Sequence, residues 1–377
     1  MNRILLVASI FPPEIGGPAT FIDQLAHELS REGYVVTVVC SSTGRDISDF
    51  SRPFRVIRVF SRLWAIQIYK MIPVLAWQML WHDAVLVNGF EYSAYWASLI
   101  TRRRYTLKIV GDSAWEEARG SGISALSIDD FQKMRNFTGR VKRLHDWRKK
   151  YLERANRIIV PSEYLKRLVT GWGVLQTKIR VVYNGVLFSS ELIDQPRYRD
   201  LEKPLQVVFV GRLTNWKGVE TLLLAVSQVN DLEVHILGDG PEYPLLFNLA
   251  EQLHLSSRVK FLGSLDHTIL LNIMRKMDVL VLGSSYEGLS HTLLEACSIS
   301  LPCVASNSGG NQEIISDGEN GLLFNYGDVN VLAALLQLLH NDEELRLKLA
   351  RKARQHVEKF DFNKTIEGTI QVLLEQK

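Results

Sequence analysis

This sequence of 377 residues lacks several features that would indicate a secreted, membrane-spanning or disulfide-stabilised protein. The three cysteines, Cys40, Cys297 and Cys303, form neither a Cys-x-x-Cys pair nor an even set. No disulfide framework is therefore predicted, and a reducing compartment is expected. No run approaches the roughly 20 apolar residues of a membrane span. The N-terminus has about seven apolar residues before two prolines, which indicates a buried first strand rather than a signal peptide.

Two chemical motifs are also missing. No Asp-x-Asp occurs, so the sequence does not indicate a metal-held diphosphate, and the nine histidines show no metal-ligand spacing. His291 is the one expected near the site described below, in a structural or hydrogen-bonding role. No Gly-x-Gly-x-x-Gly is followed by an acidic residue about 20 positions on, which argues against a nicotinamide-dependent oxidoreductase. We therefore expect no metal and no cofactor.

The composition is that of a soluble globular protein, with 46% hydrophobic and 23% charged residues, and the length suffices for two cores. The charge is unevenly spread. Residues 1–190 hold 27 Lys and Arg against 16 Asp and Glu, while residues 191–377 hold 17 against 25. A basic N-terminal half indicates an anionic partner for that half alone.

Short apolar strands alternate with helical segments along both halves of the chain. This pattern predicts an α/β protein with two doubly wound, Rossmann-like parallel-sheet domains. The polar stretch 192–204 suits a linker. We expect an N-terminal domain over 1–190, a C-terminal domain over 204–358, and a last helix within 363–377 that packs back on the first domain. The strands are expected near 4–9, 34–40, 54–60, 83–89, 105–111, 156–162, 178–185, 205–211, 233–240, 259–263, 278–284, 302–306 and 321–324.

Glycine-rich loops follow many of these strands, at the edge where parallel sheets bind ligands. Gly16 and Gly17 come after the first strand and allow backbone N–H groups to approach an anion. Gly238 lies in a tight turn that could pass close to a nucleobase. For each loop a plain strand-to-helix turn remains an alternative.

Two carboxylates lie eight residues apart, Glu287 in a loop and Glu295 inside a helix that is expected to begin near Ser290. One could lie near a sugar and the other near a ribose, while the helix start favours a diphosphate. Upstream, the segment GRLTNWKG supplies the fixed cations Arg212 and Lys217. A solvated basic loop is the alternative for that segment.

Taken in order, the segments GGPATF, IVPSEYLKRLV, VVYNGV, GRLTNWKG, LGDGP, KFLG and SSYEGLSHTLLEA resemble glycosyltransferase family 4. The resemblance spans nearly the whole chain and is strongest from 158 to 325. It implies the GT-B fold, in which two such domains face each other across a cleft, and a retaining transfer of sugar from a nucleotide diphosphate sugar.

The resemblance also implies roles for individual residues. Glu295 matches the glutamate that binds the ribose hydroxyls, and Glu287 matches the one that contacts the donor sugar. Arg212 and Lys217, after Gly211, match the diphosphate-binding pair. The N-terminal loop with Gly17 matches the segment that touches the same diphosphate.

Two further parts of the site are expected from the same resemblance. Backbone N–H groups of Gly288, Leu289 and Ser290 would complete the phosphate site. Many family members carry a histidine after the strand near 105–111, but this chain has Gly111 and Asp112 there. We expect Asp112 to act as a sugar-facing or acceptor-facing polar group. A helix N-cap is its alternative role.

Two segments of the basic half leave two interpretations open. Residues 62–82 are aromatic and apolar, and residues 132–157 form a basic helical stretch with Trp147 and Tyr151. One interpretation is contact with an anionic membrane surface, and the other is a core helix followed by a solvated helix. Nucleic acid is not an expected partner, because no recognised motif accompanies the charge.

The sequence thus predicts a hexosyltransferase that uses a UDP- or GDP-linked sugar and a glycan or lipid-linked acceptor, for cell-surface polysaccharide or glycolipid synthesis. We expect it in the cytoplasm, peripheral at the inner face of the cell membrane, with a site that closes around the donor. A non-catalytic sugar-nucleotide-binding protein, an oxidoreductase and a phosphorylase-like reaction are the alternatives.

Overall fold

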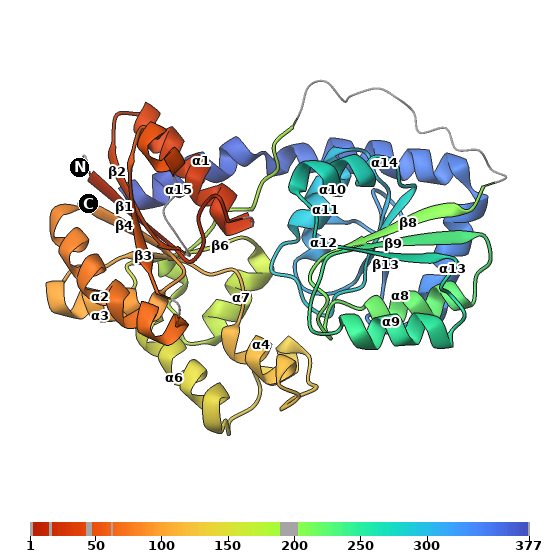
Figure 1. Cartoon of the computed structure of the whole chain (residues 1–377), viewed down its shortest axis with the longest axis horizontal. Coiled ribbons are helices and arrows are strands. Elements are labelled where there is room, and N and C mark those ends of the chain that lie inside the picture. The colour runs from red at the N-terminus through yellow and green to blue at the C-terminus, as the bar shows by residue number, and fades with distance from the viewer. Residues whose placement is uncertain (1–2, 15–16, 43–46, 62, 189–202, 376–377) are drawn as a thin grey trace. The chain divides into compact units, whose positions relative to one another are not determined.

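The chain forms two compact units, which are described separately (Figure 1). A computed structural model describes all residues except 1–2, 15–16, 43–46, 62, 189–202 and 376–377. Unit 1 comprises Met1–Ala114, Arg135–Tyr183 and Asn363–Lys377, and unit 2 comprises Trp115–Met134 and Asn184–Phe362. Each unit is therefore assembled from stretches that are far apart in the sequence. Most of the expected linker lies outside the described residues.

Unit 1 is built on a parallel sheet, which has seven strands in the described part of the chain, in the order β3-β2-β1-β4-β5-β6-β7. The order reverses between β1 and β4, and at such a point the loops after the strands diverge and leave room for a ligand. The strands are β1 (Arg3–Ala8), β2 (Val35–Ser42), β3 (Arg55–Phe60), β4 (Ala84–Asn88), β5 (Thr106–Lys108), β6 (Arg157–Val160) and β7 (Ile179–Val181).

Helices lie on both faces of this sheet, α1 and α15 on one and α2 and α3 on the other (Figure 1). The apolar residues of α1 recur at helical spacing and are buried, and Gly33, with a φ of 87°, follows the end of that helix. The helical elements are α1 (Gly17–Arg31), η1 (Ile47–Ser51), α2 (Trp64–Trp81), α3 (Glu91–Thr101), α6 (Gly139–Arg154), α7 (Glu163–Gly171), η2 (Gln176–Lys178) and α15 (Phe362–Leu374).

Unit 2 repeats this plan with six parallel strands in its described residues, in the order β10-β9-β8-β11-β12-β13. Its order reverses between β8 and β11. The strands are β8 (Leu205–Val210), β9 (Leu232–Leu237), β10 (Val259–Gly263), β11 (Val279–Leu282), β12 (Cys303–Ser306) and β13 (Leu322–Phe324).

Helices α8, α9 and α13 lie on one side of the unit 2 sheet, and α10, α11 and α14 on the other (Figure 1). Helix α4 (Ser113–Gly120) spans the boundary at Ala114 between the units. The other elements are α5 (Ile128–Phe131), α8 (Val219–Ser227), α9 (Tyr243–Gln252), α10 (His267–Met274), α11 (His291–Ser298), α12 (Asn311–Ile314), α13 (Val329–Asn341), α14 (Glu343–Val357) and η4 (Glu358–Phe360).

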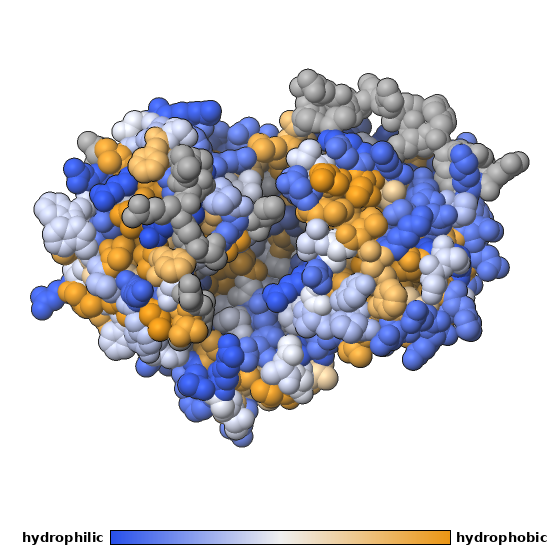
Figure 2. All heavy atoms as spheres, in the orientation of Figure 1, coloured by the Kyte–Doolittle hydropathy of each residue, from blue (hydrophilic) through white to orange (hydrophobic). Residues whose placement is uncertain are grey.

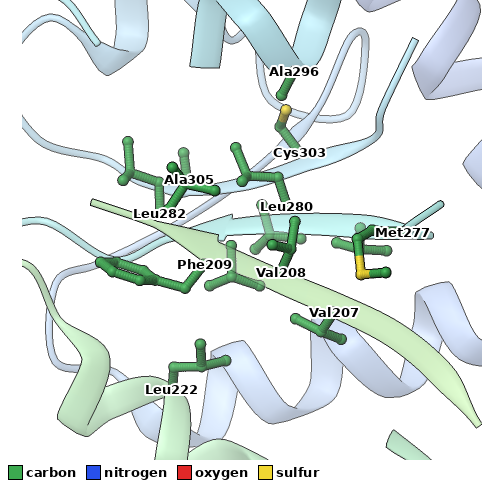
Figure 3. Packing of buried hydrophobic residues seen from close by; sticks show 14 of the residues in the cluster. Val207, Val208, Phe209, Leu222, Met277, Leu280, Leu282, Ala296, Cys303 and Ala305 are labelled. Atoms are coloured by element: carbon green, nitrogen blue, oxygen red, sulfur yellow. The ribbon is translucent and has the colours of Figure 1, made fainter. Parts of the chain in front are cut away.

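The core of unit 2 forms where β8, β11 and β12 pack against the helices (Figure 3). Phe209 on β8, Leu222 on α8 and Leu280 on β11 are almost completely buried. Cys297 and Cys303 are free thiols inside this core, with their sulfur atoms 4.0 Å apart. They fill space between α11 and β12, which confirms the packing role expected for them.

All the strands expected from the sequence are present, within a few residues of their predicted ends, and the predicted fold class is confirmed. On the face in view in Figure 2, hydrophobic and hydrophilic residues are interspersed. Among the described residues, no helix has the length and apolarity needed to cross a bilayer.

Candidate functional site

The candidate site of unit 2 lies at the carboxyl ends of β8 and β11, the two strands where the sheet order reverses. The segment Gly211–Gly218 leaves β8, and the segment Gly283–Ser290 leaves β11. Parallel neighbouring strands bring the ends of these segments to the same edge of the sheet. The predicted donor residues of both segments therefore lie on one edge.

Lys217 and Glu287, 70 residues apart in sequence, form an ion pair at this edge. The Lys217 Nζ atom lies 2.6 Å from Glu287 Oε1, and the two side chains are only 20% and 14% exposed. The same Oε1 atom accepts a hydrogen bond of 2.7 Å from the Ser284 hydroxyl. Within the described residues Oε2 has no hydrogen-bond partner. Glu287 is thus held in one orientation and keeps one oxygen available to a ligand.

Arg212 lies at the start of the same segment and is exposed. Among the residues that the structure describes, its guanidinium makes no ion pair. Its backbone carbonyl accepts a bond from the N–H of Thr214, which helps to shape the turn. Because the side chain is exposed, it can bring a second permanent cation to an anion bound near Lys217.

Glycines let the backbones of these segments touch. Gly218 has a φ of 73°, and a Cβ atom there would lie 2.0 Å from the carbonyl oxygen of Gly283. Gly238, after β9, has a φ of 136°, and its Cβ would lie 1.9 Å from the carbonyl oxygen of Gly211. Both positions exclude any side chain, so the loops after β8, β9 and β11 form one close-packed layer.

The loop after β12 packs against the backbone of Glu287 and Gly288. The N–H of Gly310 donates to the Glu287 carbonyl at 2.8 Å, and Gly309 has a φ of 60°. A Cβ on Gly309 would lie 2.3 Å from that carbonyl, and one on Gly310 would lie 2.2 Å from the carbonyl of Gly288. The sequence marked this loop only as one of several glycine turns, and its support of Glu287 went unpredicted.

Helix α11 begins where the sequence predicted. Ser290 is its N-cap, and its hydroxyl accepts a hydrogen bond from the N–H of Leu293. Gly288, Leu289 and Ser290 are buried, so the chain between Glu287 and α11 passes through the interior of the unit. A serine cap with the positive end of a helix beside it favours a nearby anion.

Glu295, in the second turn of α11, contacts a residue that sequence reasoning missed. Its Oε1 atom lies 2.8 Å from Nε2 of His267, the first residue of α10. This hydrogen bond raises the pKa of His267 above its ordinary value, although partial burial opposes the change. His267 therefore orients the carboxylate predicted to bind ribose. The histidine had no signal of its own, because 28 residues separate the pair.

An aromatic cluster of Trp115, Trp216 and Tyr286 lies next to the ion pair. Trp115 of α4 is fully buried, with its ring centroid 5.7 Å from that of Trp216 and 5.4 Å from that of Tyr286. The indole N–H of Trp115 donates to the carbonyl of Leu126. Trp216 and Tyr286 directly adjoin Lys217 and Glu287, so the cluster fixes the segments that carry the ion pair. No local sequence pattern indicates this cluster.

The predicted residues of unit 1 lie at the carboxyl edge of its own sheet. Gly17 is exposed and is the first residue of α1, whereas Gly16 lies outside the described residues. Asp112 is completely buried, and its carboxylate accepts a bond from the N–H of Ala114 and pairs with Arg148 of α6. These contacts match the capping alternative for Asp112. Its predicted sugar-facing role stays a prediction.

Comparison with known proteins gives these sites their context. The model of glycosyltransferase family 4 matches residues 15–187, and the model of glycosyl transferases group 1 matches residues 193–356. The lipopolysaccharide core biosynthesis glycosyltransferase LpsE of Rhizobium meliloti is 31% identical over 234 residues. That alignment covers 59% of this chain and 66% of the relative, so it spans just under two thirds of that protein.

Two solved structures share the fold over essentially the whole chain. Sucrose-phosphate synthase of Thermosynechococcus elongatus superposes with a TM-score of 0.80 at 21% identity, covering 100% of this chain and 99% of that one. Anabaena HepE in complex with UDP-glucose superposes with a TM-score of 0.77 at 19% identity, covering 99% of each chain. Together with the two family models, these similarities show that the chain belongs to glycosyltransferase family 4 and has the GT-B fold.

Proposed function

We propose that this protein transfers a hexosyl group from a nucleotide diphosphate sugar to a hydroxyl of a glycan or lipid-linked acceptor, with retention at the anomeric carbon. The ion pair between Lys217 and Glu287 supports this proposal most directly. It presents a cation and a carboxylate oxygen at the point of the unit 2 sheet where α/β proteins bind ligands. Arg212 adds a second cation from the same segment.

In the proposed mechanism, the bond between the anomeric carbon and the phosphate oxygen breaks first. Negative charge then grows on the departing diphosphate, and Lys217 and Arg212 stabilise it. The acceptor hydroxyl forms its bond to the anomeric carbon on the same face, and its proton passes to the departing phosphate oxygen. No protein base is then needed, which agrees with the replacement of the family histidine by Gly111 and Asp112.

Glu287 has a separate role in this proposal. Its Oε1 atom is already occupied by Lys217 and Ser284, whereas Oε2 can accept a hydrogen bond from a donor-sugar hydroxyl. A carboxylate held by two partners keeps its position when the sugar binds, which is the preorganisation that such a contact requires. Glu295, oriented by His267, is proposed to accept hydrogen bonds from the ribose.

We further propose that the reaction proceeds without a metal ion. The fixed charges of Lys217 and Arg212, with the positive end of α11 in the same unit, are suited to the task that a divalent cation performs elsewhere. UDP is our preferred nucleotide because HepE, which shares the fold, binds UDP-glucose. GDP remains the alternative, since the proposed contacts of the two glutamates, Lys217 and Arg212 do not distinguish one nucleotide base from another.

The acceptor is proposed to belong to cell-surface glycan or glycolipid synthesis at the cytoplasmic face of the membrane. LpsE, with its role in lipopolysaccharide core synthesis, supports this class. Helices α2 and α3 of unit 1 also present an aromatic–basic surface. It consists of Ile66, Tyr69, Trp77, Leu80, Trp81, Trp96, Leu99 and Ile100, followed by Arg102, Arg103 and Arg104, all exposed.

Several properties of this aromatic–basic surface fit an anionic bilayer. Trp77 and Trp81 of α2 are 60% and 54% exposed, and α2 contains no acidic residue. The rings of Tyr92 and Trp96 of α3 pack edge-on and tilted against that of Trp147 of α6, which joins the basic helix to the same side of unit 1. Exposed indole rings beside cations are typical of proteins that bind the membrane interface.

A panel of UDP-, GDP- and ADP-linked sugars tests the main proposal. Each donor would be assayed for thermal stabilisation of the protein and for slow donor hydrolysis, first with a chelator and then with added Mg²⁺ or Mn²⁺. We expect one nucleotide sugar to stabilise the protein and to be hydrolysed in the presence of chelator. Stabilisation without hydrolysis or transfer to any acceptor would instead indicate a sugar-nucleotide-binding protein. Strict dependence on added metal would contradict the metal-free mechanism.

A further inference from the structure

A cavity of about 210 Å³ lies in unit 2 at the carboxyl ends of β12 and β13. Asn307 directly follows β12, Asn325 directly follows β13, and the side chains of Asp317 and Asp328 line the same space. The candidate donor site follows β8 and β11 instead, and no described residue of that site lines this cavity. The cavity is therefore a second hollow at the ligand-binding edge of the sheet.

Both carboxylates at the cavity use only one of their two oxygens within the described part of the chain. Oδ1 of Asp317 accepts a hydrogen bond of 2.8 Å from the N–H of Leu323. Oδ1 of Asp328 caps α13 by accepting one of 3.0 Å from the N–H of Val331. The two Oδ2 atoms and the side-chain amides of the two asparagines have no hydrogen-bond partner among the described residues. Four side chains thus offer unused polar atoms around one small space.

The rest of the lining is apolar. Phe324, which is 3% exposed, and Leu323 come from β13, and Val331, which is 41% exposed, comes from α13. A concave apolar surface with a few fixed polar groups is the usual form of a small-molecule site. Drug-sized ligands occupy roughly 300–1,000 Å³, so this cavity suits a smaller molecule such as a single sugar ring.

The chemistry of the lining favours a hydroxyl-rich ring over a metal ion. A hexose carries hydroxyl groups around its edge and C–H groups on its faces. Carboxylates accept hydrogen bonds from such hydroxyls, and side-chain amides both donate and accept them. A calcium ion takes about six to eight oxygen ligands. Among the residues that the structure describes, no three Asp, Glu, His or Cys side chains gather as a metal site.

The loops around the cavity also contact the two donor segments. Phe324 packs against Gly283, where a Cβ atom would lie 3.5 Å from the Phe324 Cζ atom, and Gly283 begins the segment that leaves β11. The hydroxyl of Tyr326 donates to the carbonyl of Asn215 at 3.3 Å, in the segment that leaves β8. A ligand in the cavity would therefore rest on the same loops that hold the donor site.

We propose that this cavity binds one sugar unit of a glycan and is a carbohydrate site distinct from the donor site. Sugar hydroxyls donate to the unused oxygens of Asp317 and Asp328, the amides of Asn307 and Asn325 complete the polar contacts, and the ring lies against Phe324. That the glycan is the acceptor or the product of transfer rests on the function proposed above. The cavity would then hold a long glycan by a unit other than the one that reacts.

Methyl α-glycosides of glucose, galactose and mannose test the proposal, with their binding measured by saturation-transfer NMR. The parent protein carries Glu287→Gln, which weakens the proposed sugar contact of the donor site. Asp317→Asn and Asp328→Asn are then combined, because asparagine keeps each hydrogen bond from a backbone N–H, including the helix cap, but removes the negative charge. Val331→Phe instead fills the cavity and leaves every charge in place.

Each cavity variant has a matched control in unit 2. Asp342→Asn neutralises the N-cap of α14, which accepts a hydrogen bond of 2.8 Å from the N–H of Leu345. Leu338→Phe enlarges another exposed residue of α13, 42% exposed against 41% for Val331. Neither control residue lines the cavity, and thermal unfolding verifies that every variant is folded.

We expect at least one glycoside to bind the parent protein. Its affinity should fall about tenfold or more in the doubly neutralised protein, the usual effect of losing a hydrogen bond to a charged group, and also in Val331→Phe. Both controls should bind as the parent does. Equal affinity in the parent and in either cavity variant, or no binding by any glycoside, would overturn the inference.

Two further results separate this site from its alternatives. Displacement of the glycoside by added CaCl₂ would indicate a cation site in the cavity and would also overturn the inference. Glycoside binding through the cavity in a protein that neither hydrolyses nor transfers any sugar would contradict the proposed function but not this site.

Discussion

Removal of the Lys217 ammonium is the most informative perturbation of the candidate donor site. In Lys217→Ala the departing diphosphate loses a fixed cation, and the side chain of Ala cannot replace it. We expect kcat to fall by roughly 10²-fold or more, about 3 kcal/mol, the usual effect of losing one group that stabilises charge in the transition state. The KM for the donor should change less, because Arg212 and the ribose contacts remain.

The same substitution has a second effect, on stability, that can be estimated from burial. The Lys217 and Glu287 side chains are 20% and 14% exposed, so their pair lies between a surface pair and a fully buried one. Surface pairs contribute under about 1 kcal/mol, and breaking a buried pair costs roughly 3–5 kcal/mol. We therefore expect Lys217→Ala to lower the free energy of unfolding by about 2 kcal/mol. Adding Glu287→Ala should recover part of that loss.

Donor hydrolysis and urea unfolding measure the two effects separately. Lys260→Ala is the control, because Lys260 forms an exposed ion pair of 3.2 Å with Glu233 in the same unit. That variant should keep nearly wild-type turnover. Unchanged kcat in Lys217→Ala would refute the proposed diphosphate role. An equal loss in Lys260→Ala would show that the effect is one of overall charge and not of position.

Four further predictions concern the donor site of unit 2 and the aromatic–basic surface of unit 1. Glu295→Ala should weaken nucleotide binding about tenfold by calorimetry, as expected for one lost charge-assisted hydrogen bond, and an unchanged Kd would exclude the ribose role. The raised pKa of His267 means that its pair with Glu295 stabilises the protein below the ordinary histidine pKa and loses this effect as pH rises through the raised value. His267→Gln should therefore lower Tm more at about pH 5.5 than at about pH 8.5, and equal losses would contradict the assignment. Gly218→Ala should cost at least about 2 kcal/mol in urea unfolding because of backbone strain and overlap with Gly283, whereas Gly33→Ala, also at positive φ but with open space around it, should cost about 1. Finally, serine at positions 102–104 should reduce binding to anionic vesicles, while neutralising the exposed cations Lys348, Arg351 and Lys352 of α14 should not, and equal binding to neutral vesicles would argue against membrane contact.

The strands and the site edge could be predicted from the sequence because both depend on local patterns. Continuous apolar runs bounded by glycine identify buried parallel strands. Glu287 and Lys217 could be assigned to one site because each follows a strand, and parallel strands end at a common edge. Their ion pair was not predicted. Ser290 was recognisable as the start of α11 from its residue type and the apolar pattern that follows it.

The contacts that no local pattern encodes were missed. Arg148 pairs with Asp112, 36 residues away, and no sequence pattern around either residue indicates the other. Trp115 packs on Trp216 and Tyr286 only because residues 115–134 belong to unit 2, although the chain on either side belongs to unit 1. Lys108 stood in the sequence as one polar residue inside an apolar strand. It is buried because α1 packs over the end of β5, and this contact between distant segments has no local sequence pattern.

Unit 1 is assembled from segments that are far apart in the chain, and this affects its folding during synthesis on the ribosome. Helix α15 completes this unit, and the Thr365 hydroxyl donates to the Tyr183 carbonyl, yet the rest of unit 1 lies before residue 184 in the chain. Residues 184–362 come first, which at about 5–20 residues per second delays α15 by roughly 10–40 s. Residues 115–134 of unit 2 have been made by then, so all segments of unit 2 are present before unit 1 is complete. The unit that emerges first is therefore expected to finish folding last, with an incomplete face that a chaperone can bind in the interval.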